Sequence, residues 1–542
     1  MKNIFKATSL IALTSAVAFT SCIDEVYPTS NVSQEQLESS SKAGDAMIMA
    51  MPAFMVNWNT SGAEWHGDFG YSSMMHIRDC MTGDMSILEA GLNYNQWPNY
   101  TQIVYLGQNY ASVQRIWNYL NKQVLACNKA AGAFPDGIED EHGKGARATA
   151  LAFRAMVYLD LARWYEFLPN KYTSPMVGAT DDFAGNNVEG LTVPIVTELT
   201  TEEEARNNPR ATHAEMSAFI LSDLDYAEQN IGYAEYGTRL LPDLACVYGL
   251  KARLYMWNGE YEKAADFAKK AIDASGRTPL TKDAWTNPTT GFNTLDNTSW
   301  MWGLQFSSEN DAVATGICNW TSMMSPEAEY GYAGVGACPI VDASMYARIS
   351  DTDFRKLSWV TPGVTDLSYD FPLCVEANRA YYVRNFPYAC IKFRPGQGNG
   401  SDSNVGSATA VPVMRVEEMW FNYIESVAHS NPAQGKSLLV EFMTTYRDPN
   451  YTCEATDQDA IIEEIVFQKR VELWGEGHTL FDIKRLNYSV TRNYPGTNFY
   501  AGSEHNTIGR PAWVNMVIVQ SEGNNNKAVD GWNNPDIPQV YE

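Results

Sequence analysis

The chain has 542 residues, a formal net charge of −25 and 45% hydrophobic residues. Nucleic acid is excluded as a partner, because phosphate binding needs clustered Lys and Arg on a basic surface. The hydrophobic content is sufficient for a large core, and the length would ordinarily correspond to roughly three or four domains.

The N-terminus has the features of a lipoprotein signal. A basic start is followed by an apolar stretch from Ile4 to Phe19 and then by Thr20-Ser21-Cys22. The apolar stretch is shorter than the roughly 20 residues that a membrane-spanning helix needs. We therefore predict a signal peptide at residues 1–21 and an acylated Cys22. The alternatives are a secretory signal with an incidental cysteine and a short membrane anchor.

Export to the cell surface is suggested by the residues after the lipidation site. Ile23-Asp24-Glu25 follow Cys22 directly. An acidic pair at this place resembles the signal that sends some Gram-negative lipoproteins to the outer face of the outer membrane. We therefore expect the protein to be lipid-anchored and exposed outside the cell.

Helices are predicted over most of the remaining chain. A capping box, Thr212-x-x-Glu215, opens one of them. Apolar residues recur at helical spacing in seven segments: Thr101–Ala131, Ala146–Phe167, Thr212–Ile231, Val413–Ser430, Ala433–Tyr446, Gln458–Trp474 and His478–Leu486.

A helical hairpin is predicted between Leu244 and Ser275. Two amphipathic patterns meet at Asn258-Gly259-Glu260, where the glycine can end one helix and release the next. Small residues at Ala252, Ala264 and Ala271 fall at the close-packing positions of a tetratricopeptide (TPR) repeat.

Residues 276–414 interrupt the helices with a stretch rich in Gly, Asn, Pro and Tyr. We predict a large loop-built insertion here. Within it, Trp300, Trp302, Leu304 and Phe306 alternate with other residues, which predicts a strand with one buried face.

The C-terminal motifs closely resemble the signature of the SusD/RagB family, and earlier segments agree with it in order. The matching segments are Gln468-Lys469-Arg470-Val471-Glu472-Leu473, Gly475-Glu476-Gly477-His478, Phe481-Asp482-Ile483-Lys484-Arg485, Ala150-Leu151-Ala152-Phe153-Arg154-Ala155, and Pro209-Arg210-Ala211-Thr212 with Asp223-Leu224. The resemblance covers nearly the whole mature chain. It implies a surface glycan-binding lipoprotein.

These observations together predict a mainly α fold. We expect a TPR-like helical-repeat scaffold with a large loop-rich insertion that contains short β-strands. The expected parts are an N-terminal helical region at 22–275 with an aromatic ligand loop at 58–100, the insertion at 276–414, and C-terminal helices with an irregular tail at 415–542, all in one compact unit.

Two acidic residues of the C-terminal motif, Glu472 and Glu476, are expected to be structural. They lie four residues apart on one helical face and would repel unless cations neutralise them. We predict a buried ionic network, with Lys469, Arg470 or Arg485 as the partners. The alternative, in which these carboxylates and Asp482 catalyse glycoside hydrolysis, needs a pair that faces across a sugar.

Ligand-binding residues are expected in two non-helical aromatic segments, Trp58–Tyr100 and Trp285–Tyr332, and family resemblance indicates the same regions. Aromatic rings stack on the apolar faces of sugars, and polar side chains bind the hydroxyls. Trp97 and Trp320 are the first candidates, since both lie in polar loops; either could instead fill a gap beneath its loop. The other candidates are Trp65, Trp285, Tyr332, Arg78, Asp84, Asn95, Asn99 and Asn319, although Arg78 and Asp84 could pair with each other.

No cofactor or catalytic metal is expected. The seven histidines show no metal-ligand spacing, although the many Asp and Asn side chains are compatible with a structural calcium ion. Besides Cys22, eight cysteines show neither a CxxC motif nor a repeating framework. We expect scattered buried thiols.

The favoured function is capture of oligo- or polysaccharide without catalysis. The resemblance implies delivery of this ligand to a SusC-like, TonB-dependent transporter in the outer membrane. The alternatives are a TPR-type scaffold that binds only protein, and a glycoside hydrolase. The glycan is not specified, because a local group of Arg379, Arg384, Lys392 and Arg394 could override the acidic average.

Overall fold

The computed structural model describes residues 41–88, 97–170, 185–363 and 371–535. The predicted signal peptide, Cys22 and Asn95 lie outside these ranges. Within the described ranges, none of the helices has the length and hydropathy needed to cross a membrane.

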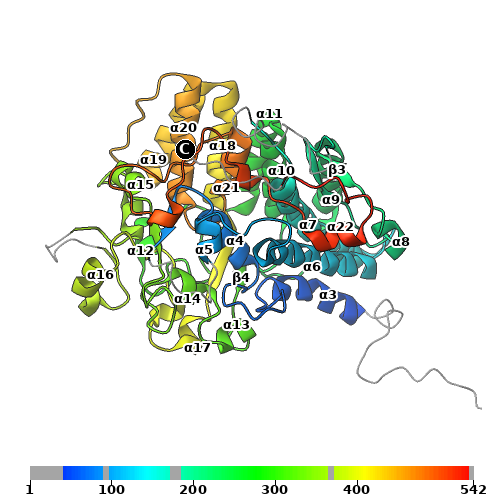
Figure 1. Cartoon of the computed structure of the whole chain (residues 1–542), viewed down its shortest axis with the longest axis horizontal. Helices are drawn as coiled ribbons and strands as arrows, with labels where there is room; N and C mark the ends of the chain where they lie inside the picture. Colours follow the sequence, from blue (N-terminus) through cyan, green and yellow to red (C-terminus); the bar gives the residue numbers. More distant parts are fainter. Residues whose placement is uncertain (1–40, 89–96, 171–184, 364–370, 536–542) are drawn as a thin grey trace, which may run out of the picture.

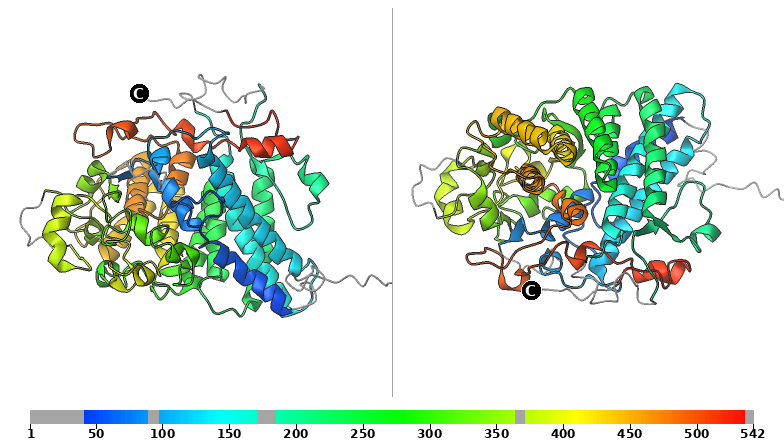
Figure 2. Two further views of the ribbon diagram at one scale, coloured as in Figure 1. Left: turned by 60° about the horizontal axis from the view of Figure 1, so that its bottom comes forward. Right: turned by 90° about the horizontal axis from the view of Figure 1, so that it is seen from above.

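Helices dominate the N-terminal half, as predicted. They are α3 (Ser41–Phe54), α4 (Tyr71–Cys80), α5 (Trp97–Thr101), α6 (Ala111–Ala133), α7 (Glu141–Tyr165), α8 (Glu202–Ala205), α9 (His213–Asn230), α10 (Leu244–Asn258) and α11 (Tyr261–Ser275). The long helices α6, α7, α9, α10 and α11 pack side by side in chain order (Figure 2).

The predicted capping box and hairpin are both present. Thr212 Oγ1 accepts a hydrogen bond from Glu215 N, and the Glu215 carboxylate accepts one from Thr212 N. Gly259 ends α10 in the left-handed conformation, with a φ of 72°, which a glycine adopts without a Cβ penalty. The mainly α, TPR-like fold class is therefore confirmed.

The predicted helix Thr101–Ala131 begins later than expected. Residues 102–110 form a loop, and α6 starts only at Ala111. Ile103 and Tyr105 adopt positive φ angles of 56° and 58°, which are incompatible with a right-handed helix. Backbone hydrogen bonds hold this loop in place instead, including one from Val104 N to Asn99 O at 2.9 Å.

Short helices and strands make up the insertion, which lies at one end of the molecule in Figure 1. Its helices are α12 (Lys282–Thr286), α13 (Asp311–Ala314), α14 (Trp320–Met324), α15 (Ala343–Arg348), α16 (Arg379–Asn385) and α17 (Ser403–Gly406). The described strands form three antiparallel pairs: β1 (Met85–Ile87) with β5 (Pro339–Val341), β2 (Leu191–Pro194) with β3 (Arg210–Thr212), and β4 (Trp300–Gln305) with β6 (Ala410–Arg415).

Strand β4 confirms the predicted strand, but the expectation of a single buried face is wrong. Residues on both of its faces are buried, including Met301 at 3% exposure. One face packs on the helices, with the Trp302 ring 4.8 Å from that of Phe153. All of its residues are buried except Gln305, which is half-buried, so the strand lies inside the molecule.

The C-terminal part adds α18 (Val416–Ser430), α19 (Pro432–Tyr446), α20 (Gln458–Glu472), α21 (Thr479–Leu486) and α22 (Gln520–Asn525). Its tail runs back across the N-terminal helices (Figure 2). Met516 N donates to Trp164 O at 3.1 Å, and Lys527 N donates to Arg206 O at 2.9 Å. One continuous hydrophobic cluster contains residues from Ile48 to Val529, so all three predicted parts contribute to the same core.

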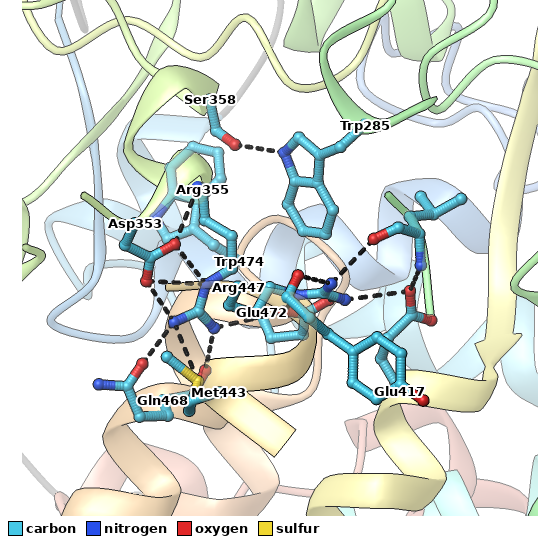
Figure 3. A network of polar contacts seen from close by, with 12 residues as sticks. Trp285, Asp353, Arg355, Ser358, Glu417, Met443, Arg447, Gln468, Glu472 and Trp474 are labelled. Atoms are coloured by element: carbon cyan, nitrogen blue, oxygen red, sulfur yellow. Dashed lines mark hydrogen bonds and ion pairs between the residues drawn. The ribbon is translucent and has the colours of Figure 1, made fainter. Parts of the chain in front are cut away.

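A buried ionic network joins α20 to the insertion, as Figure 3 shows. Glu472 accepts from Arg447 Nε at 2.7 Å, and Arg355 Nη1 lies 3.3 Å from its carboxylate. Glu476 accepts from Arg415 Nε at 2.8 Å and from Lys392 Nζ at 2.6 Å. Although burial raises the pKa of Glu472, the facing guanidiniums, Arg447 foremost, hold it below its usual range.

The network is present, but the predicted cations are wrong. Lys469 pairs with Asp482 at 2.9 Å, Arg470 pairs with Asp84, with Nε 2.9 Å from Oδ2, and Arg485 pairs with Glu425 at 2.6 Å. All three are therefore paired with carboxylates other than Glu472. The cations that reach it come from segments far away in the sequence.

Candidate functional site

The two aromatic segments of the sequence meet in the fold. Trp97 Nε1 donates to the sulfur of Met323 at 3.2 Å, and a hydrogen bond of 2.6 Å joins His66 Nδ1 to the Tyr332 hydroxyl. These contacts span 226 and 266 residues of sequence. Loop 57–68 and loop 325–338 therefore form one region of the surface.

Trp97 and Trp320 are not exposed on polar loops as expected. Both rings are 1% exposed. Trp97 begins α5 and packs edge-on against His76 at 4.4 Å, and Trp320 begins α14 and packs against Phe393 at 5.0 Å. The expected open indole faces are absent because short helices turn both rings inward; their contact with ligand stays a prediction.

Trp285, Tyr332 and Asn319 are also buried. Trp285 Nε1 donates to Ser358 Oγ at 2.8 Å beside the ionic network (Figure 3). Tyr332 is 9% exposed. Asn319 caps α14, with its side-chain oxygen accepting from Ser322 N at 3.0 Å. In this conformation Trp285 and Asn319 support the fold rather than face a ligand.

Arg78 and Asp84 do not pair with each other. Arg78 Nη1 lies 3.0 Å from Asp160 Oδ2, and Asp84 pairs with Arg470. Both side chains are buried. The last candidate, Asn99, is half-buried and donates to Ser112 Oγ at 2.9 Å. It therefore fixes the turn between α5 and α6.

Among the four predicted ligand tryptophans, Trp65 is partly exposed and the other three are buried. It lies on a loop that hydrogen bonds hold in place. Buried Asp68 accepts from Thr60 Oγ1 at 2.8 Å and from Ser61 N at 2.8 Å. Trp58 Nε1 donates to Trp65 O at 3.2 Å. These bonds order the loop that carries Trp65.

A buried arginine lies directly beneath Trp65. The Arg115 guanidinium is 5.7 Å from the Trp65 ring centroid and 5.4 Å from those of Trp97 and Tyr100. It is fully buried, and among the described residues none of its nitrogens has a hydrogen-bond partner. One sequence feature indicates this residue, which is a charge between Val113 and Ile116 on the apolar side of α6.

The histidines of this region are held neutral at pH 7. Burial lowers the pKa of His66. Burial and, secondarily, the Arg115 charge lower that of His76 to about 3. The polar groups of the site therefore include neutral imidazoles, and the exposed acidic residues Glu64 and Glu329 lie on the same two loops.

Two open grooves of about 580 Å³ each lie elsewhere. One is lined by Arg348, Tyr451, Glu464 and Phe467, among others, and the other lies between Leu280 and Arg447. None of the predicted ligand residues that the structure describes lines either groove. In the described ranges, no group of three or more His, Cys, Asp or Glu is placed to hold a metal ion.

The carboxylates considered for glycoside hydrolysis are unsuitable for it. Glu472, Glu476 and Asp482 are 0%, 2% and 6% exposed. Each is ion-paired inside the molecule. They therefore cannot face one another across a sugar.

The fold is that of the SusD-like proteins. A SusD-like carbohydrate binding protein from Bacteroides vulgatus matches with a TM-score of 0.67 and 21% identity, over 90% of this chain and 96% of that one. A SusD superfamily protein from Bacteroides thetaiotaomicron matches with a TM-score of 0.64 and 17% identity, over 90% and 98% of the two chains.

The sequence comparisons agree with the fold. Residues 371–530 match the model of the SusD family, SusD_RagB. The SusD-like protein P2 of Formosa agariphila is 22% identical over 288 residues, which is 49% of this chain and 55% of the relative. These matches confirm the resemblance to the SusD/RagB family that the motifs predicted.

Proposed function

We propose that this protein binds glycans without catalysis, at the junction of loop 57–68 and loop 325–338. The observation that carries this proposal is the convergence of the two aromatic segments at one face, with Trp65 partly exposed on an ordered loop. A matched structure is described as a carbohydrate binding protein, which supports the same ligand class.

Trp65 is the proposed stacking residue. An indole on a fixed loop offers an apolar face to the C–H groups of a sugar ring at little cost in conformational entropy. The neighbouring His66 and Tyr332 supply neutral polar groups for hydroxyls. Such a contact contributes on the order of 1 kcal/mol, so capture depends on several contacts or several copies.

The proposed cellular role is delivery of the bound glycan to a SusC-like, TonB-dependent transporter. It is supported by the match of residues 371–530 to the SusD family and by the predicted lipoprotein signal that ends at Cys22. Lipid at Cys22 would hold the protein on the outer face of the outer membrane.

Affinity electrophoresis of residues 23–542 in gels that contain neutral or acidic polysaccharides tests this proposal. Wild type is compared with Trp65→Ala and with Trp532→Ala, a control tryptophan that is 42% exposed on the C-terminal tail. We expect retardation by at least one polymer, weakened several-fold by Trp65→Ala alone, and no sugar released. Folded wild type that passes every polymer unretarded would contradict glycan binding and favour the protein-binding scaffold.

A further inference from the structure

Two exposed tyrosines form a corner on the loop between α5 and α6. Tyr105 is 57% exposed and Tyr110 is 46% exposed. Their ring centroids lie 5.3 Å apart, and the ring planes meet at 65°. Among the described residues, no other two exposed aromatic side chains make a ring contact with each other.

The loop that presents these rings is fixed from below. Gln520 N of the C-terminal tail donates to Gln108 O at 3.1 Å, and His505 Nε2 lies 3.0 Å from Gln102 O. Tyr110 N donates to Gly107 O at 3.0 Å. The corner is therefore held in one shape before any ligand arrives, which lowers the entropy that binding has to overcome.

The residues that flank the corner in the sequence are uncharged. Residues 90–114 contain no Asp, Glu, Lys, Arg or His, although 19% of the chain is charged. The amide side chains of Asn109 and Gln114 are exposed on either side of Tyr110. Aromatic faces beside amide donors and acceptors suit a ligand that has apolar ring faces and uncharged hydroxyls.

We propose that the Tyr105–Tyr110 corner is a second carbohydrate-binding site, which takes a neutral pyranose unit of a polysaccharide. Two partly exposed tyrosines offer on the order of 200 Å², far less than the roughly 800 Å² that each partner buries in a stable protein complex. A single sugar ring matches that area. The site is distinct from the one at Trp65. The inference rests on the proposed function in one respect, which is that both sites bind carbohydrate.

The test uses residues 23–542 in affinity gels that contain dextran, soluble starch, laminarin or xyloglucan, with polygalacturonate as the acidic probe. Tyr105→Asn combined with Tyr110→Ala removes both rings, and asparagine tolerates the left-handed conformation at position 105. Tyr105→Phe combined with Tyr110→Phe keeps both rings. Tyr381→Ala is the matched control, since Tyr381 is 48% exposed on α16.

We expect the loss of both rings to weaken binding of one neutral polymer about tenfold, which corresponds to about 1.4 kcal/mol. The phenylalanine pair should retain most of the affinity, and Tyr381→Ala should match wild type. Thermal unfolding midpoints close to that of wild type would show that the variants are folded, because the replaced side chains are on the surface.

Four results would overturn this inference. If Trp65→Ala weakens binding while the variant without Tyr105 and Tyr110 rings binds like wild type, glycan binding stands and the second site fails. Retardation of wild type by polygalacturonate alone would likewise leave glycan binding standing and contradict a second site for a neutral sugar. Retardation by no polymer would remove both proposals. A control variant that loses as much affinity as the double variant would also count against the site.

Discussion

The guanidinium of Arg447 forms a bidentate ion pair with the carboxylate of Glu472, with Nε 2.7 Å from Oε2 and Nη2 2.9 Å from Oε1. Both side chains have 0% exposure. Arg447 also donates to Leu280 O at 2.9 Å, so it ties the beginning of the insertion to α20. Because these charges are shielded from water, their pairing decides whether the insertion and the C-terminal helices fit together.

Replacing Glu472 by glutamine should destabilise the protein by about 3–5 kcal/mol, because it leaves buried arginines without their shared anion. The measurement is the denaturant midpoint at pH 7. The control is Glu202→Gln at the solvent-exposed pair of Glu202 and Arg206, where the change should be much smaller. Equal effects at the two sites would show that the buried network contributes no more than a surface pair.

Arg115→Met should be tolerated far better than Arg447→Met, even though both arginines are buried. Arg115 makes no hydrogen bond that the described residues reveal and contacts three aromatic rings instead. The loss should be about 2 kcal/mol or less, because methionine keeps the packing and removes a desolvated charge. Thermal unfolding of the two variants side by side checks this, and a larger loss at Arg115 would contradict it.

Stability should fall as the pH drops from about 5 towards 2. Burial raises the pKa of Glu418, but the facing Arg253, whose Nε lies 2.6 Å from Oε1, more than offsets this and lowers it to about 2. Burial also raises the pKa of Asp160, but the charge of Arg78 outweighs this effect and lowers that pKa to about 2. A folded pKa below the unfolded value means that the stability is present above the unfolded pKa and is lost as pH falls through the folded one.

Glu418 alone accounts for about 3 kcal/mol of this expected change. The measurement is the urea midpoint at pH 7, 5, 4 and 3 at constant ionic strength. A midpoint that stays constant between pH 5 and 3 would contradict the prediction, since it would mean that these carboxylates titrate alike in the folded and unfolded chains.

The eight described cysteines should behave as unreactive thiols. All are unpaired, and all but Cys374 are buried. Burial raises the pKa of Cys374 to about 12, and it does the same for Cys127, so little thiolate is present at pH 8. A thiol reagent should label native protein slowly and label all eight cysteines in urea, and a reductant should leave the unfolding midpoint unchanged. Rapid labelling of several native thiols would contradict this.

The helices were predictable because their signals are local. The capping box at Thr212 and the glycine at position 259 act within one turn of the backbone, so neighbouring sequence is sufficient to place them. The start of α6 was not predictable in the same way. Its apolar spacing continues into residues 102–110. Hydrogen bonds from the distant tail, however, hold this loop in a backbone conformation that is not helical.

The ligand residues illustrate the same limit. A tryptophan in a polar stretch is equally compatible with an exposed platform and with a buried plug, because burial depends on what packs over it. Met323 and His76 enclose Trp97, and the loop of Trp65 remains at the surface above Arg115. Neither outcome is encoded within a few residues of either ring.

The sequence by itself determined the mainly helical scaffold, its hairpin and the resemblance to the SusD/RagB family, since each rests on short-range spacing or on motif order. Only the tertiary structure decided which cations neutralise Glu472, which aromatic rings are buried, and where Tyr105 and Tyr110 stand together in solvent. The physical reason is that charge pairing and exposure depend on contacts between segments that lie from 25 to 266 residues apart in these examples, and local spacing does not specify those contacts.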